Sequence, residues 1–329
     1  MNEEKKECEE YSEEISGLYI VATPIGNLGE ITQRAKYVLS AADYIAAEDT
    51  RNTGLLLKLL QVPYQKFIAY HKFNETAKQS YILQKLQQGN SVALVSDAGM
   101  PCISDPGYVL VQTAAKNGIT VHAVSGACAM VNALAVSGFP TEPFVFVGFL
   151  PKKQPVKAVI TPFLQGLQNL QTLQTLQTLQ TLQSEQKQSV KNFENGLTLV
   201  FYQSPKRIIG TIQQFCEDFP LTKLCICNDI SKKFERIYRG TPLEVLAELQ
   251  ENANAEKGEY TGVAFFPSIA NGNLGESEEK QSLESQLVDI MVTKGCTVKE
   301  AVAILAESNK IIGKREIYAA GLRLRGLFG

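Results

Sequence analysis

Residues 18–29, LYIVATPIGNLG, form a short apolar run that ends at Pro24 and passes into a turn containing Gly26 and Gly29. An apolar run bounded in this way predicts a β-strand followed by a loop. The loop is neither a G-x-G-x-x-G fingerprint nor a Walker loop, because it lacks the first glycine of the one and the Gly-Lys-Ser/Thr of the other. Pro24 also removes an N–H donor from any phosphate cradle. The loop therefore disfavours a nicotinamide or nucleoside-triphosphate site.

Apolar strands and helical spacings alternate along the rest of the chain. In the first part, strands are predicted at 18–23, 44–47, 92–96 and 121–124, and helices at 31–42, 53–60 and 76–88. This alternation predicts a parallel sheet covered on both faces. The pattern then restarts, with strands predicted at 197–202, 223–228 and 260–266 and helices at 204–219 and 242–249. The predicted fold class is α/β, with two α/β domains.

Changes in composition predict the domain boundaries. Residues 1–16 carry seven Glu and two Lys and are expected to be a disordered acidic tail. Two α/β domains at 17–138 and 139–268 follow, then a polar linker at 269–281 and a helical basic appendage at 282–329, where Thr297 and Glu300 have capping-box spacing. Leu-Gln-Thr repeats dominate residues 167–183 of the second domain. Leucines spaced by three drift around a helix, so a repeat expansion is favoured over a coiled coil.

Composition limits the cellular setting and the metal chemistry. The chain has no apolar run near the ~20 residues of a membrane span, and its acidic start is no secretion signal, so a cytoplasmic protein is expected. Seven cysteines, an odd number, indicate reduced thiols. Cys225 and Cys227 should share one face of a strand, but the chain has only two histidines. Structural thiols are therefore favoured over zinc, and no metal is expected.

The net charge of -2 and pI near 5.9 argue against a nucleic-acid partner when taken alone. Residues 294–329, however, carry seven Lys and Arg against three Glu. A local basic surface is therefore compatible with the negative net charge of the whole chain.

Two more loops follow predicted strands, where open α/β sheets bind ligands. In VSDAGMPCISDPG, residues 95–107, Gly99 allows close approach of the backbone to a ligand, and Asp97 could accept a hydrogen bond from an amino or hydroxyl group. Asp105, before Pro106, is expected to cap the next helix. In the loop at 124–129, small residues should leave helix N–H groups free for a carboxylate or phosphate.

Several stretches, in order, resemble one enzyme family: LYIVATPIGNLGEIT, AAEDTR, VALVSDAGMPCISDPG, VGFLP, FYQSPKR and KGEY. The chain is similar to the ribosomal RNA small-subunit methyltransferase I family, in the tetrapyrrole-methylase-like class, from about Gly17 to Phe266 and into the helical tail. The resemblance implies two α/β domains with S-adenosylmethionine in the cleft between them. It also implies a homodimer that methylates the ribose 2′-hydroxyl of a decoding-region cytidine in 16S RNA of the small ribosomal subunit.

The family's motifs also imply where the cofactor is held, largely by backbone groups. Carried over, the cofactor contacts fall at Pro24, Asp97, Gly99, Met100, Ile103, Cys128, Ala129 and Tyr202. The chain departs from the family at Met100 and Cys102, where Thr and Gly are more common, at Ser125–Cys128 in place of Pro-Gly-Pro-Ser, and at Asn228-Asp229 in place of Arg-Glu. Binding through the backbone would survive these departures better than side-chain contacts.

A ribose hydroxyl is a weak acid, so a general base would help its methylation. Glu48 and Asp49 end a predicted strand at the expected cleft. We hypothesise that one of them accepts the proton and that Arg51 orients it or binds phosphate. The alternative is that this segment only caps a helix and forms a local ion pair.

Lys206 and Arg207 stand in a predicted first helical turn, where cations oppose the helix dipole, so an anionic partner is favoured. Predicted RNA phosphate contacts are Lys206 and Arg207, Lys152 and Lys153, and Lys314, Arg315 and Arg323 of the tail. Two other functions remain open: methylation of a porphyrinoid or another non-RNA substrate, and RNA binding without catalysis.

Overall fold

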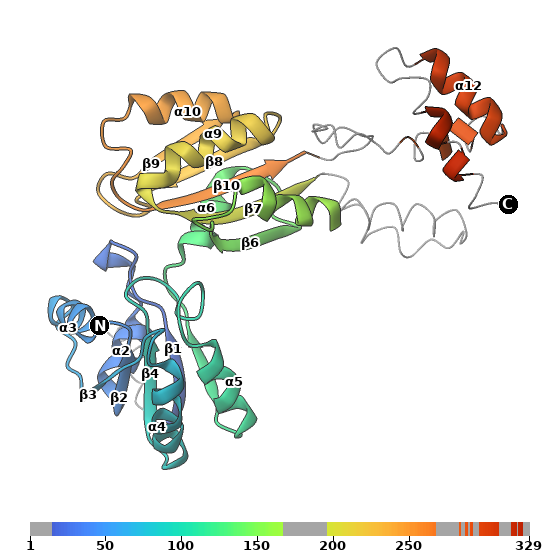
Figure 1. Ribbon diagram of the computed structural model, residues 1–329. Helices are drawn as coiled ribbons and strands as arrows, with labels where there is room; N and C mark the ends of the chain where they lie inside the picture. The colour runs from blue at the N-terminus through green and yellow to red at the C-terminus, as the bar shows by residue number, and fades with distance from the viewer. Residues whose placement is uncertain are drawn as a thin grey trace, which may run out of the picture. The chain divides into compact units, whose positions relative to one another are not determined.

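The computed structural model describes residues 15–166 and 196–267, and within the tail residues 283, 287–288, 290–291, 296–308, 317–320 and 322–324. The chain divides into two compact units, Met1–Ala270 and Asn271–Gly329, which are described separately. The first unit contains two five-stranded sheets (Figure 1). The predicted acidic tail, the Leu-Gln-Thr repeat, the linker at 269–281, Lys314 and Arg315 lie wholly or almost wholly outside the described residues.

The first sheet is parallel, as the alternation of strands and helices predicts. Its strands are β1 (Gly17–Val21), β2 (Tyr44–Ala47), β3 (Lys66–Ala69), β4 (Ser91–Val95) and β5 (Val121–Val124), in the order β3-β2-β4-β1-β5. Its connections contain η1 (Leu28–Glu30), α2 (Gln33–Ala41), α3 (Thr50–Leu59), α4 (Glu75–Gln87) and α5 (Tyr108–Lys116). All four strand pairings are parallel, so the carboxyl ends of the strands meet at one edge.

Both faces of this sheet are buried. Tyr19 and Val21 of β1 pack into one apolar cluster, and Leu18 and Ile20 pack into another on the opposite face. Successive side chains of a strand point to opposite faces, so a strand covered on both sides must be apolar at every position. This explains the uninterrupted run at the start of the chain.

Leu94→Ala should lower the free energy of unfolding by about 2–5 kcal/mol, since Leu94 in β4 is 1% exposed and its truncation leaves a cavity. Urea unfolding followed by circular dichroism measures the change. Leu55→Ala is the control, because Leu55 in α3 is 58% exposed and its truncation should change stability by less than about 0.5 kcal/mol. Equal losses in the two variants would contradict the described core.

The second sheet is mixed rather than parallel. Its strands are β6 (Phe144–Phe149), β7 (Leu197–Gln203), β8 (Lys223–Asn228), β9 (Arg236–Gly240) and β10 (Tyr260–Phe266), in the order β6-β7-β10-β8-β9. Only the pairing of β6 with β7 is parallel; the other three are antiparallel. The sheet is accompanied by α6 (Ala129–Ser137), η2 (Pro205–Arg207), α9 (Ile208–Asp218) and α10 (Pro242–Glu251).

Helix α6 joins the two halves of the first unit. It follows the last strand of the first sheet, yet Ala133 and Leu134 pack with Val200, Cys225 and Val263 of the second sheet. The strand ends of the first sheet are therefore connected directly to a helix that covers the second.

The second unit is helical where it is described. Helix α12 (Val298–Ser308) begins at the predicted capping box, since the Glu300 carboxylate accepts hydrogen bonds from the Thr297 N–H and hydroxyl, both at 2.8 Å. Leu305 packs with Ile317, Ala320 and Leu324 in a small apolar cluster. Among the described residues, no helix combines the length and the apolar character needed to cross a membrane.

Candidate active site

A cavity of about 360 Å³ lies where loops from both sheets of the first unit meet. Its lining residues are Ile25, Glu48, Asp97, Ala98, Gly99, Met100, Ile103, Ser104, Asp105, Cys128, Ala129, Phe149, Tyr202, Gln203, Ser204, Pro205, Glu259, Tyr260 and Thr261. The volume falls within the range of about 300–1,000 Å³ that is usual for small-molecule sites. The loops after β1, β2, β4 and β5 all contribute, as expected at the carboxyl edge of a parallel sheet.

Backbone hydrogen bonds join the loops after β1 and β4. The Thr23 N–H donates to the Gly99 carbonyl at 2.9 Å, and the Gly99 N–H donates to the Thr23 carbonyl at 3.0 Å. Gly99 has φ +83°, and a Cβ there would come within 3.3 Å of Ile25 Cγ2. A side chain at this position would strain the backbone and crowd the cavity wall.

Most of the predicted cofactor residues lie around this cavity. Those in the lining are Asp97, Gly99, Met100, Ile103, Cys128, Ala129 and Tyr202. Pro24 is buried immediately before Ile25 and is outside the lining. Phe149 and Glu259 line the cavity and stand within the quoted motifs VGFLP and KGEY, which assigned them no role. Nothing in the sequence marks Thr261 as a cavity residue, because it lies inside an apolar strand.

The prediction that Asp105 caps a helix was wrong. Helix α5 begins at Tyr108 after Gly107, whose φ of +135° suits glycine, and Asp105 instead lines the cavity. Burial, followed by the charge of Glu48, raises the pKa of Asp105 to about 6, although a hydrogen bond with the Ser96 side chain lowers it in part. This carboxyl group therefore titrates near neutral pH.

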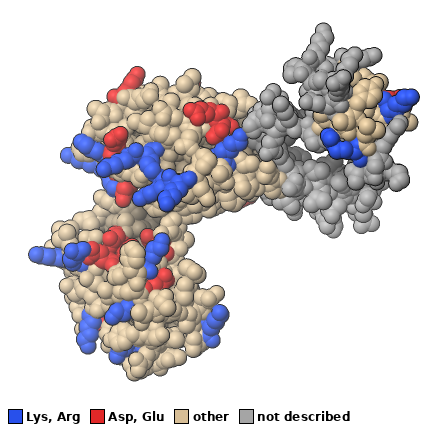
Figure 2. Space-filling view, viewed as in Figure 1, with Lys and Arg blue, Asp and Glu red and all other residues tan. Residues whose placement is uncertain are grey.

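Glu48 and Asp97 place two more carboxylates on the same wall. Burial, followed by the nearby charge of Asp97, raises the pKa of Glu48. Asp97 is held by the loop after β2, accepting hydrogen bonds from the Asp49 N–H at 3.2 Å and from Asn52 Nδ2 at 2.9 Å. Acidic side chains also gather at one end of the first α/β half in Figure 2. This wall is suited to a ligand with positive charge.

Asp49 and Arg51 are engaged with each other. Asp49 caps α3 by accepting the Arg51 N–H at 2.9 Å, and its carboxylate receives Nε and Nη2 of Arg51 at 3.0 and 2.6 Å. Hydrogen bonds from Arg51 hold the pKa of Asp49 well below its usual range. Neither residue lines the cavity, so of the three proposed catalytic residues only Glu48 does. Asp49 and Arg51 therefore form the helix cap and the local ion pair that were the alternative to a catalytic role.

The predicted phosphate contacts differ in their surroundings. Arg207 turns inward, since its Nη2 donates to the Leu150 carbonyl at 2.6 Å and to Gln203 Oε1, and Nε donates to Ser204 Oγ at 3.2 Å. These bonds fix the ends of β6 and β7 beside the cavity. Lys206 is exposed, as are Lys152 and Lys153 in the loop after β6, whereas Arg323 belongs to the second unit.

Comparison with known proteins identifies the family. The family model described as Tetrapyrrole (Corrin/Porphyrin) Methylases matches residues 17–246. A ribosomal RNA small subunit methyltransferase I of Vibrio cholerae is 35% identical over 311 residues, covering 94% of this chain and 95% of that protein. One of Halalkalibacterium halodurans is 38% identical over 306 residues, covering 92% and 93%. Identity at this level over nearly the whole of both chains shows that this chain belongs to the ribosomal RNA small subunit methyltransferase I family of tetrapyrrole methylases.

Proposed function

We propose that the chain transfers a methyl group from S-adenosylmethionine to the ribose 2′-hydroxyl of a decoding-region cytidine in 16S RNA of the small ribosomal subunit. The observation that carries this proposal is a cavity in which the predicted cofactor loops lie beside partly buried carboxyl groups. Membership of the family supports a methyltransferase acting on ribosomal RNA. The position on the nucleotide rests on the resemblance of the motifs.

The residues present fit the cofactor. The start of α6 at Cys128 and Ala129 offers helix N–H groups to a carboxylate. Glu48, Asp97 and Asp105 offer negative charge to an ammonium or sulfonium group, and Ile25 and Met100 offer apolar surface to a purine ring. When bound, S-adenosylmethionine supplies a methyl group on a sulfonium leaving group.

Glu48 is the proposed general base. It lines the cavity, and its raised pKa makes it a better proton acceptor than an exposed glutamate. The nearby charge of Asp97 favours protonation of Glu48 and so adds to the rise in its pKa. The remaining task of the protein is to hold the hydroxyl oxygen in line with the methyl group.

The mutual contacts of Asp49 and Arg51 predict a small catalytic role for the pair. Arg51→Ala should change kcat by less than about threefold, because Arg51 lies outside the cavity lining and its ion pair with Asp49 is exposed to solvent. Radiolabelled methyl transfer to small ribosomal subunits measures the rate. A loss of a hundredfold or more would show that Arg51 contacts substrate and would contradict the structural interpretation.

The proposed function is tested by mass mapping of 16S RNA from cells with and without the gene. We expect one cytidine nucleoside to lose a ribose methyl group in the deletion strain, and the purified chain to restore it on isolated small subunits. Methylation of a base instead of a ribose would overturn the 2′-hydroxyl assignment. If the chain methylated a porphyrinoid but not the RNA, the proposed class of substrate would be overturned.

A further inference from the structure

The loop between β8 and β9, residues 229–235, has an unusual backbone and is called here the β8–β9 loop. Asp229 and Ser231 lie in the left-handed region, with φ of +52° and +67°. Residues other than glycine adopt this conformation at a cost in free energy, so contacts elsewhere must hold it.

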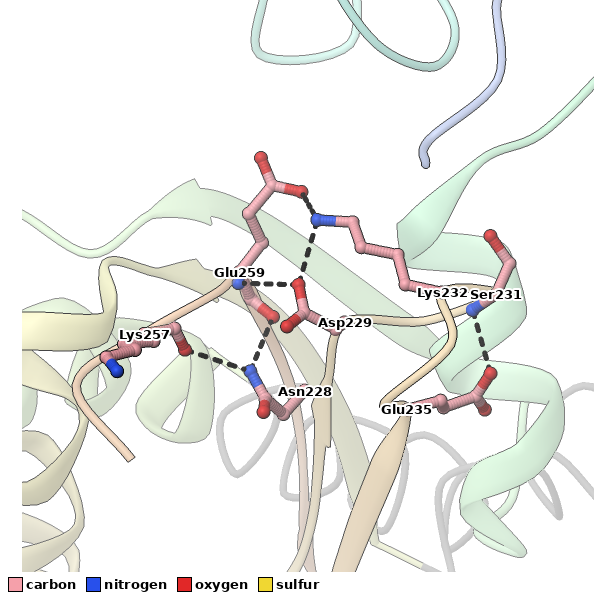
Figure 3. Close-up of polar contacts among 7 residues, drawn as sticks. All are labelled: Asn228, Asp229, Ser231, Lys232, Glu235, Lys257 and Glu259. Atoms are coloured by element: carbon pink, nitrogen blue, oxygen red, sulfur yellow. Dashed lines mark hydrogen bonds and ion pairs between the residues drawn. The ribbon is translucent and has the colours of Figure 1, made fainter. Parts of the chain in front are cut away.

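Ion pairs and hydrogen bonds fix the base of this loop (Figure 3). Asp229 Oδ1 accepts from Lys232 Nζ at 2.8 Å and from the Glu259 N–H at 3.2 Å. Lys232 Nζ also donates to Glu259 Oε2 at 2.7 Å. At the other end of the loop, the Ser231 N–H donates to Glu235 Oε2 at 2.7 Å. The loop therefore has a defined shape.

The same contacts tie the β8–β9 loop to the cavity. Glu259, which receives Lys232, lines the cavity. The aliphatic part of Lys232 lies against Gly26 in the loop after β1, where a Cβ would come within 2.5 Å of Lys232 Cγ and Cε. Gly26 has φ +135°, so glycine is needed there for both conformation and space. Lys232 thus connects the β8–β9 loop with two parts of the proposed cofactor site.

The outer part of the loop presents an aromatic ring and positive charge to solvent. Phe234 is 74% exposed, and Lys233 Nζ lies 5.5 Å from the centre of its ring. Arg236, at the start of β9, is also exposed, while Glu235 is turned back onto Ser231. Figure 2 shows Lys and Arg side chains gathered on one side of the second α/β half. An exposed phenylalanine contributes little to the core, so its place on a fixed loop calls for another explanation.

We propose that the β8–β9 loop is an RNA contact in which Phe234 stacks on an unpaired base and Lys233 and Arg236 contact the neighbouring phosphates. The inference rests on the proposed function, because it takes RNA as the substrate. An aromatic face flanked by cations is the arrangement that binds unpaired nucleotides, with the ring accepting any base and the cations meeting the backbone. The ion pair of Lys232 with Glu259 joins this contact to a residue of the cavity wall.

The proposal is tested by measuring the affinity of the full chain for small ribosomal subunits and for S-adenosylmethionine. Phe234→Ala should weaken RNA binding roughly 5- to 100-fold, the range expected for loss of one stacked base, and leave cofactor affinity within twofold. Phe234→Tyr should restore binding, since the ring is kept. Lys233→Ala should reduce the dependence of log K on log salt by about one.

Leu221→Ala and Lys223→Ala are the matched controls, because both side chains are exposed at the opposite end of β8. They should leave RNA affinity unchanged. Unchanged RNA binding by Phe234→Ala would overturn the inference while leaving the proposed function intact. Loss of cofactor affinity together with RNA affinity would also overturn it, since the loop would then act through the cofactor site. Failure of the wild-type chain to methylate RNA would instead refute the proposed function itself.

Discussion

Glu48→Gln is expected to lower the rate constant of methyl transfer by about 10²- to 10⁴-fold, the usual contribution of a positioned general base. Glutamine keeps the size of the side chain and its hydrogen-bonding oxygen but cannot accept the proton of a ribose hydroxyl. Single-turnover methylation of small ribosomal subunits at saturating cofactor measures the rate. The affinity for S-adenosylmethionine, measured by calorimetry, should fall by less than tenfold.

Asp49→Asn is the matched control for this experiment. Asp49 is the next residue in the chain and also carries a carboxylate, but it caps α3 and pairs with Arg51 outside the cavity lining. Asp49→Asn should therefore affect the free energy of unfolding more than the rate constant of methyl transfer. A full rate in Glu48→Gln would exclude Glu48 as the base, and a greater loss in Asp49→Asn would move that role to Asp49.

Asp105→Asn is expected to stabilise the fold at pH 8 and to impair the enzyme. The cavity holds the ionised carboxylate at a cost, because its pKa is raised from 3.8 to about 6 by burial and by Glu48. Removing that charge should raise the free energy of unfolding by about 1–2 kcal/mol, since water in the cavity screens part of the effect. Cofactor affinity should fall about tenfold, as one of three negative groups facing a cationic ligand is lost.

The pH dependence gives the sign of this effect. The pKa of Asp105 is higher in the folded chain than in the unfolded chain. This group therefore favours the folded state of the wild type most below pH 3.8, and its contribution to the free energy of unfolding falls as the pH rises to about 6. The stability gap between Asp105→Asn and wild type should therefore be small near pH 4 and reach its full size above pH 6. Urea unfolding at several pH values without cofactor measures the gap. A gap that is constant with pH would refute the raised pKa.

Much of the fold was predictable because burial on two sides leaves a clear pattern. The strands at 44–47, 121–124, 223–228 and 260–266 have the predicted bounds, since each is a run of mostly buried or apolar residues between turns. β3 was missed because only Ile68 of its four residues is buried, which leaves almost no pattern. β9, at one edge of the second sheet, was missed for the same reason, whereas β6, at the other edge, was missed although its sequence FVFVGF is an apolar run.

The sequence predicts which loops form the candidate site, but it does not predict the roles of the individual residues. The motifs around Gly99 and Cys128 identify the cavity walls, because both follow strands of one parallel sheet. Asp105 was assigned to a helix cap since Asp-Pro is a common helix start, but the φ of +135° at Gly107 delays the start of α5 to Tyr108. Glu259 reaches the cavity through antiparallel pairing of distant strands, which the order of motifs does not reveal.

The parallel pairing of β6 with β7 has a consequence for how this gene can change. The connection between these strands runs from residue 150 to 196 and contains the Leu-Gln-Thr repeat. The entropy of closing a connection grows only with the logarithm of its length, so one more three-residue repeat adds less than about 0.1 kcal/mol. Replication slippage in this stretch would therefore pass almost unselected on stability grounds. Strains should differ in repeat number here while the lengths of the cavity loops stay constant.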